Sequence, residues 1–141
     1  MLRLAINGYG RIGRSILRAL YESPLREELA IVAINELADA GTVLHLTRYD
    51  STHGRFPRSL AGDAKELLVD GDAIVLLNHA RIDELPWAEL GVDMVLECTG
   101  AFSDRATAEH HLRRGAGKML FSQPAQADVK KAVVYGVNHR E

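Results

Sequence analysis

Three glycines near the start of the chain have the spacing G-x-G-x-x-G. Gly8, Gly10 and Gly13 stand between an apolar run, residues 2–7, and a segment with helical periodicity. In such a strand-to-helix turn the first glycine permits a tight turn, the second lets a pyrophosphate approach the backbone, and the third lets helix and strand pack closely. The positive end of the helix then attracts the anion. The pattern predicts dinucleotide binding; the alternative is a glycine-rich turn without a ligand.

A carboxylate follows the second apolar run. Glu36 comes 23 residues after Gly13, near the spacing of roughly 20 residues at which an acidic side chain binds the adenosine ribose hydroxyls. A carboxylate there repels the 2′-phosphate of NADP, and the next residues, 37–39, supply no cation. We therefore expect NAD as the cofactor. The alternative for Glu36 alone is a solvated loop acid.

Further candidates follow later strands, because a parallel sheet binds its ligand at the carboxyl ends of its strands. Thr99 and Gly100 come just after the apolar run 92–97, and Ser122 ends the run 119–122. We expect these residues at the cofactor, although ordinary strand-to-helix turns would give the same pattern.

The residues offer little for nucleophilic or metal chemistry. Cys98 is the single cysteine, and it lacks an obvious base, while the neighbouring Glu97 would raise its pKa by charge repulsion. We expect a packed, semi-buried thiol and no catalytic residue. The histidines lack metal-site spacing, so no metal is expected, and we expect His110 and His111 on a helix surface.

Strand-like and helix-like runs alternate along the chain, which predicts a Rossmann-type, doubly wound, mostly parallel α/β sheet. Residues 50–64 are interpreted as a surface loop and 85–90 as one helical turn stopped at Gly91. The Asp-Gly pair at 70–71 predicts a local antiparallel β-hairpin insert. The predicted strands are 2–7, 30–34, 65–69, 73–77, 92–97, 119–122 and 132–137, and the predicted helices are 11–22, 40–49 and 104–114, the last two capped by Asp39 and Ser103.

Composition limits the remaining choices. A chain of 141 residues, 47% hydrophobic and 26% charged, has the size and balance of one domain. Its 17 basic and 19 acidic residues give a net charge of −2 with no basic stripe, so we expect no nucleic acid. Its apolar runs are far shorter than the roughly 20 residues that cross a bilayer. With one cysteine and no secretory signal, we expect a cytoplasmic protein.

Several stretches resemble successive signatures of the glyceraldehyde-3-phosphate dehydrogenase superfamily. They are residues 6–14 (INGYGRIGR), 32–37 (VAINEL), 49–54 (YDSTHG) and 98–100 (CTG). Three others are more similar to the erythrose-4-phosphate dehydrogenase branch of that superfamily, namely 35–40 (NELADA), 85–93 (LPWAELGVD) and 133–138 (VVYGVN).

The resemblance implies places for the cofactor. Arg11 and Ile12 would lie at the pyrophosphate, Arg81 on the adenine side, and the residues after the later strands on the nicotinamide side. The expected cofactor-binding residues are therefore Asn7, Gly8, Gly10, Arg11, Ile12, Gly13, Glu36, Arg81, Thr99, Gly100 and Ser122.

The resemblance also implies an activity for a full-length parent enzyme, expected to be a homotetramer. That enzyme would oxidise an aldose phosphate with NAD: D-erythrose 4-phosphate to 4-phosphoerythronate for pyridoxal phosphate biosynthesis, or glyceraldehyde 3-phosphate in glycolysis. Residues 1–141 correspond to the NAD-binding domain, and the family's cysteine motif and catalytic domain would come afterwards, so this chain alone is expected to be inactive. A non-catalytic NAD-sensing module is the alternative.

Overall fold

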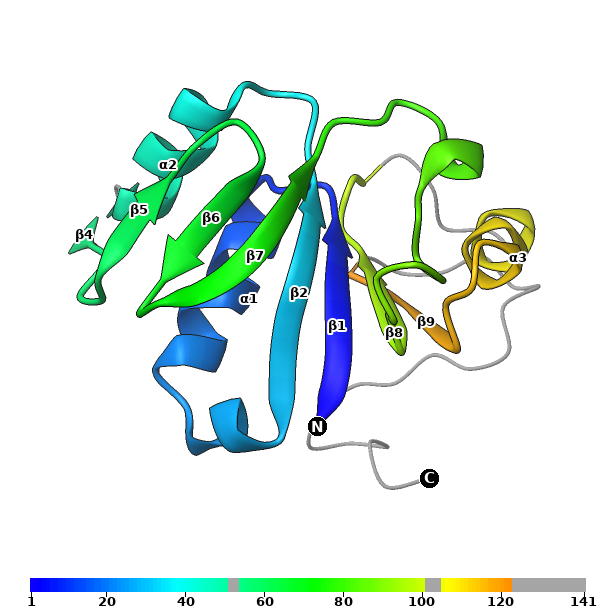
Figure 1. Ribbon diagram of the computed structural model, residues 1–141, viewed down its shortest axis with the longest axis horizontal. Helices are drawn as coiled ribbons and strands as arrows, with labels where there is room; N and C mark the ends of the chain where they lie inside the picture. Colours follow the sequence, from blue (N-terminus) through cyan, green and yellow to red (C-terminus); the bar gives the residue numbers. More distant parts are fainter. Residues whose placement is uncertain (51–53, 101–104, 123–141) are drawn as a thin grey trace.

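A computed structural model describes residues 1–50, 54–100 and 105–122. The predicted cap Ser103 and the predicted strand 132–137 lie outside these ranges. A seven-stranded sheet forms the centre of the fold (Figure 1), with the order β5-β6-β7-β2-β1-β8-β9. In that order the strands are Leu60–Gly62, Glu66–Val69, Asp72–Leu77, Leu29–Asn35, Leu2–Asn7, Met94–Glu97 and Lys118–Phe121.

Pairing in the sheet confirms the predicted fold class. β1 pairs in parallel with β2 and with β8, while β2 pairs in parallel with β7, and β8 with β9. Within this sheet, β6 runs antiparallel to both of its neighbours, β5 and β7. Because successive parallel strands are added first on one side of β1 and then on the other, the strand order reverses at β1, and a doubly wound sheet binds its ligand at such a switch point.

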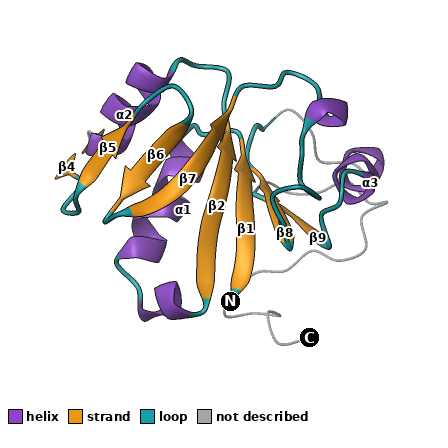
Figure 2. Cartoon of the chain, in the orientation of Figure 1, coloured by secondary structure: helices purple, strands orange, loops and turns teal. Residues whose placement is uncertain are grey.

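Helices cover both faces of the sheet (Figure 2). They are α1 (Arg11–Tyr21), α2 (Ala40–Arg48) and α3 (Arg105–Arg113), with short 3₁₀ turns η1 (Pro24–Glu27) and η2 (Ile82–Glu84). The predicted cap of α2 is confirmed, because the Asp39 carboxylate accepts a 2.8 Å hydrogen bond from the Thr42 N–H. The two 3₁₀ turns were not predicted.

Alternate residues of β1 enter two separate cores. Leu4 and Ile6 pack with Leu17 of α1, whereas Ala5 lies in a second cluster that contains Trp87. Burial on both faces explains why the central parallel strands are largely apolar. The small Ala5 leaves room for the indole ring, which is fully buried.

The predicted surface loop at 50–64 is wrong in part. Tyr49–Asp50 (β3) and Gly54–Arg55 (β4) form a short antiparallel pair, so α2 ends at Arg48 and the predicted helix was one residue too long. Leu60–Gly62 joins the main sheet as β5 and supplies partners for the backbone of β6. An edge strand tolerates polar neighbours, which is why composition alone indicated a loop.

The predicted hairpin and the predicted turn at 85–90 are both present, with one difference. β6 and β7 form the predicted antiparallel hairpin, but β7 also pairs in parallel with β2 and is therefore a full member of the sheet. The predicted turn at 85–90 is present: the Leu90 N–H donates to the Pro86 carbonyl at 3.1 Å, and Gly91 follows with φ of 63°. In the described part of the chain, no helix has the length and apolar character needed to cross a membrane.

Candidate cofactor-binding site

A cleft of about 450 Å³ opens at the carboxyl ends of the central parallel strands. Hydrogen bonds hold these strand ends level: the Gly8 N–H donates to the Asn35 carbonyl at 2.9 Å, and the Cys98 N–H donates to the Asn7 carbonyl at 2.7 Å. The cleft therefore lies over the switch point at β1. Its lining residues are Asn7, Gly8, Gly10, Asn35, Glu36, Leu37, His79, Ala80, Ile82, Leu85, Cys98 and Thr99.

The three fingerprint glycines have three different environments. Gly8 has φ of 93°, and a Cβ there would lie 2.6 Å from the Thr99 nitrogen, so the backbones of β1 and β8 nearly touch. A Cβ at Gly13 would lie 2.6 Å from the Gly8 carbonyl oxygen, which brings helix and strand together. A Cβ at Gly10 would meet no atom within 4 Å. Gly10 thus leaves open space in front of the loop.

The first turn of α1 is also available to an anion. The leading N–H groups of a helix have no intrahelical acceptor. Gly10, which precedes α1, has no side chain that could cap them. Arg11 and Ile12 occupy this turn and are exposed. The helix end and the open space at Gly10 together fit a pyrophosphate.

Glu36 lies beside the glycine loop. Its Oε1 accepts a 2.9 Å hydrogen bond from the Tyr9 N–H, and its Oε2 accepts one of 3.0 Å from the Ala38 N–H. A carboxylate offers about four acceptor positions, so both oxygens retain capacity for the hydroxyls of a ribose. These two bonds fix the carboxylate at the edge of the cleft.

The structure brings together only some of the other predicted residues. Thr99 lines the cleft, and Gly100 follows it with φ of 74°. Ser122 is exposed at the end of β9, where its N–H donates to the Glu97 carbonyl at 3.0 Å. Arg81 is not among the lining residues: its side chain is 72% exposed and forms a 3.1 Å ion pair with Asp83. Its adenine-side role stays a prediction.

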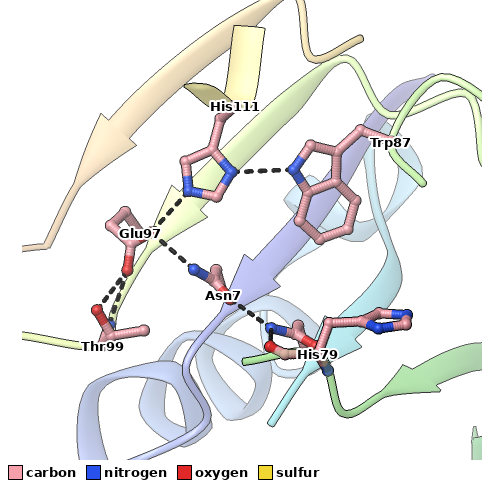
Figure 3. Close-up of polar contacts among 7 residues, drawn as sticks. Asn7, His79, Trp87, Glu97, Thr99 and His111 are labelled. Carbon is pink, nitrogen blue, oxygen red and sulfur yellow. Dashed lines mark hydrogen bonds and ion pairs between the residues drawn. The ribbon is translucent and has the colours of Figure 1, made fainter. Parts of the chain in front are cut away.

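A buried chain of hydrogen bonds lies beneath the cleft (Figure 3). The indole Nε1–H of Trp87 donates to Nδ1 of His111 at 3.0 Å, and Nε2 of His111 lies 2.7 Å from Oε2 of Glu97. The same oxygen accepts a 2.8 Å bond from Nδ2 of Asn7, whose Oδ1 accepts one of 2.8 Å from Asn35. The chain therefore joins three strands, the loop after η2, and α3.

The indole at one end fixes the proton on His111. An indole N–H only donates, so Nδ1 must accept, and the ring proton is assigned to Nε2, which donates to Glu97. The ring is therefore the neutral tautomer. Burial raises the pKa of Glu97, but hydrogen bonds from His111, Thr99 and Asn7 outweigh burial and hold that pKa below its ordinary value. Glu97 is an anion.

The expectation that His110 and His111 lie on a helix surface is wrong for His111, which is completely buried. Its two ring nitrogens have partners from Trp87 and Glu97, which removes the penalty for burying a polar ring. His110 is half-buried, with Nδ1 3.3 Å from the Asp83 carboxylate.

Cys98 is half-buried, as expected, and lines the cleft. Burial raises the pKa of its thiol above the ordinary value, and the charge of Glu97 adds to the rise, against a lowering by a hydrogen bond with Ser122. Burial is thus the larger cause, where sequence reasoning named only Glu97. Among the described residues no group of three or more His, Cys, Asp or Glu side chains is arranged to hold a metal ion.

Sequence reasoning missed the part of the cleft that follows β7. The Oδ1 of Asn35 accepts a 2.8 Å hydrogen bond from the His79 N–H, and Nδ2 of Asn35 donates to the His79 carbonyl at 2.9 Å. The available signal was that 78–79 directly follow a strand. The interpretation of β7 as part of an insert hid that position.

Together these features define a Rossmann-type dinucleotide-binding domain, with a switch-point cleft, an uncapped helix end, and a carboxylate that can accept from a ribose. The sequence matches the family model described as glyceraldehyde 3-phosphate dehydrogenase, NAD binding domain, over residues 2–105, more than half of the chain. The chain belongs to this family, and NAD is its cofactor.

Proposed function

We propose that this chain is the NAD-binding domain of an aldose-phosphate dehydrogenase that oxidises D-erythrose 4-phosphate to 4-phosphoerythronate, a step toward pyridoxal phosphate, and that the full-length parent is a homotetramer. The observation that carries the cofactor half of this proposal is the cleft that joins Gly10, Glu36 and Thr99. The substrate rests on the similarity of residues 35–40 and 85–93 to the erythrose branch, and Glu36, Leu37 and Leu85 from these stretches line the cleft. Glyceraldehyde 3-phosphate is the competing substrate.

Each part of the cleft has a proposed role toward NAD, which supplies the hydride acceptor when bound. Glu36 binds the adenosine ribose, and the loop from Gly8 to the first turn of α1 binds the pyrophosphate. Thr99, Gly100 and Ser122 lie on the nicotinamide side. This division follows the sheet order, because Glu36 follows β2 and Thr99 follows β8, on opposite sides of β1.

Calorimetric titration of the chain with NAD⁺ and NADP⁺ tests the cofactor site. We expect tighter binding of NAD⁺, because the Glu36 carboxylate would face the 2′-phosphate. Glu36→Ala should narrow the preference by about 1–3 kcal/mol, the cost of removing a partner of buried polar groups. The matched control is Glu22→Ala, an exposed acid at the far end of α1. Equal binding of the two cofactors by the unsubstituted chain would remove the role of Glu36.

The substrate is tested with the protein encoded by the complete reading frame. We expect NADH formation with a higher kcat/KM for erythrose 4-phosphate than for glyceraldehyde 3-phosphate, with and without inorganic phosphate. The reverse order would assign the glyceraldehyde branch. NAD binding without turnover of either aldehyde would favour a sensing module.

A further inference from the structure

One buried anion terminates the hydrogen-bond chain of Figure 3. Glu97 is 1% exposed, and both oxygens of its carboxylate accept hydrogen bonds. Oε2 accepts from Asn7 at 2.8 Å and from His111 at 2.7 Å, while Oε1 accepts from the Thr99 N–H at 3.2 Å and from the Thr99 hydroxyl at 2.6 Å. All four donors are uncharged, given the neutral tautomer of His111.

The negative charge is therefore solvated by dipoles without being neutralised. Among the described residues, Arg18 is the other charged side chain in the buried set. Its guanidinium donates to the carbonyls of Thr47 and Gly54 and lies over the Phe56 ring, in the core on the α1 side of the sheet. The Glu97 network instead reaches Trp87 in the opposite core. The field of Glu97 acts on whatever occupies the space next to Thr99.

That space lies on one particular side of the switch point. Glu97 is the last residue of β8, and Thr99, which it holds by two hydrogen bonds, lines the cleft. Glu36 stands at the end of β2, across β1. A dinucleotide with one ribose at Glu36 and its pyrophosphate over Gly10 extends its other half over the end of β8.

We propose that Glu97 makes the cleft select the redox state of its cofactor, by favouring the cationic nicotinamide ring of NAD⁺ over the neutral ring of NADH. The inference rests on the proposed orientation of NAD in the cleft. It needs no contact between Glu97 and the ring, because a buried charge that no cation neutralises is weakly screened and acts over several ångströms. The hydrogen bond from Trp87 keeps the imidazole of His111 neutral. This ring therefore orients the Glu97 carboxylate without cancelling its charge.

Equilibrium binding of NAD⁺ and NADH to the same chain separates this field from ordinary damage. Loss of positioning weakens both ligands together, whereas loss of the charge weakens NAD⁺ relative to NADH. The measured quantity is the ratio of the two Kd values, by calorimetry for NAD⁺ and by fluorescence for NADH. Glu97→Gln removes the charge at nearly constant shape and should shift the ratio by about tenfold or more, because at an effective dielectric constant of about 20 two unit charges within about 12 Å of each other interact at least that strongly.

A second variant reaches neutrality by another route. His111→Lys places an ammonium group beside Glu97 from α3, so it should shift the ratio in the same direction although the carboxylate remains. The matched control is Thr99→Val, which removes one hydroxyl donor to Glu97 and keeps the charge. It should weaken both ligands with little change in the ratio. Circular dichroism establishes which variants are folded.

The outcomes are distinct. A folded Glu97→Gln or His111→Lys chain with an unchanged Kd ratio overturns the inference and leaves the proposed function intact. If neither variant folds, the unsubstituted chain decides: binding of NADH at least as tight as binding of NAD⁺ overturns the inference. Failure of the unsubstituted chain to bind either form contradicts the proposed function itself.

Discussion

Replacing Gly8 with alanine tests whether the contact between β1 and β8 requires a glycine. The residue has φ of 93°, a region that non-glycine residues rarely occupy. The new Cβ would also lie 2.6 Å from the Thr99 nitrogen and 2.7 Å from its Cα. Both are backbone atoms in a paired strand end, so no side-chain rotation relieves the overlap.

The two penalties add to a large fraction of a typical domain's stability. Backbone strain of this kind costs about 1–3 kcal/mol, and the shift forced by overpacking costs about 1–3 kcal/mol more. We therefore expect Gly8→Ala to lower the free energy of unfolding by about 2–6 kcal/mol. At about 2–4 °C per kcal/mol for a domain of about this size, the Tm should fall by about 4–24 °C.

Gly10→Val is the matched control from the same loop. Gly10 has φ of −80°, and a Cβ there meets nothing within 4 Å. The free energy of unfolding of Gly10→Val should stay within about 1 kcal/mol of that of the unsubstituted chain, since only a helix-capping position changes. NAD binding should be lost, because the valine side chain fills the space of the pyrophosphate. Urea denaturation and calorimetry measure both effects. Equal stability of the Gly8 and Gly10 variants would refute the steric argument, and retained NAD affinity in Gly10→Val would show that the loop is only a turn.

Two further predictions concern titrating groups. Burial raises the pKa of Tyr9 to about 12, above the ordinary value of about 10, so the unfolded chain loses this proton first. Burial disfavours the phenolate, against a smaller lowering of the pKa by the 2.7 Å bond with Thr47. The stability linked to the neutral hydroxyl is therefore complete below about pH 10 and is lost as pH rises through about 12, in total about 2–3 kcal/mol. In urea denaturation at alkaline pH, Tyr9→Phe should lose less stability than the unsubstituted chain, and identical pH profiles would contradict the assignment. Burial raises the pKa of Cys98. Its thiol should therefore react with a disulfide reagent more slowly in the folded chain than in urea at the same pH. Equal rates would show that the thiolate is accessible and not disfavoured by burial.

The glycine fingerprint and the parallel strands could be predicted because their signals are local. Gly13 stands within a few residues of the backbone that it contacts, whereas Gly8 contacts the distant Thr99. An apolar run likewise indicates its own burial. The same holds for the Asp39 cap, where donor and acceptor are three residues apart. The identity of the cofactor followed from Glu36 and from the absence of a cation at residues 37–39.

The wrong or missing assignments at the site depend on long-range contacts. His111 is hydrophilic and lies on a helix with several charged residues, so it was expected on the surface. Its burial depends on Trp87 and Glu97, which are 24 and 14 residues away. The link between Asn35 and His79 spans 44 residues. No local pattern reports such pairings, because each residue alone has the composition of a loop or a surface.

The polar residues beneath the cleft solve a problem that the switch point itself creates. Leu17 of α1 packs in one core, whereas His111 of α3 contacts Trp87 in the other, and the cleft opens at the strand ends between them. Asn7 and Asn35 lie at these ends and are buried, so each would cost about 1–3 kcal/mol without partners. Asn35 is paired with Asn7 and with the His79 backbone, and Asn7 donates to Glu97, whose carboxylate accepts several hydrogen bonds and donates none. The anion that takes part in this network is therefore also the charge that we propose acts on the cofactor.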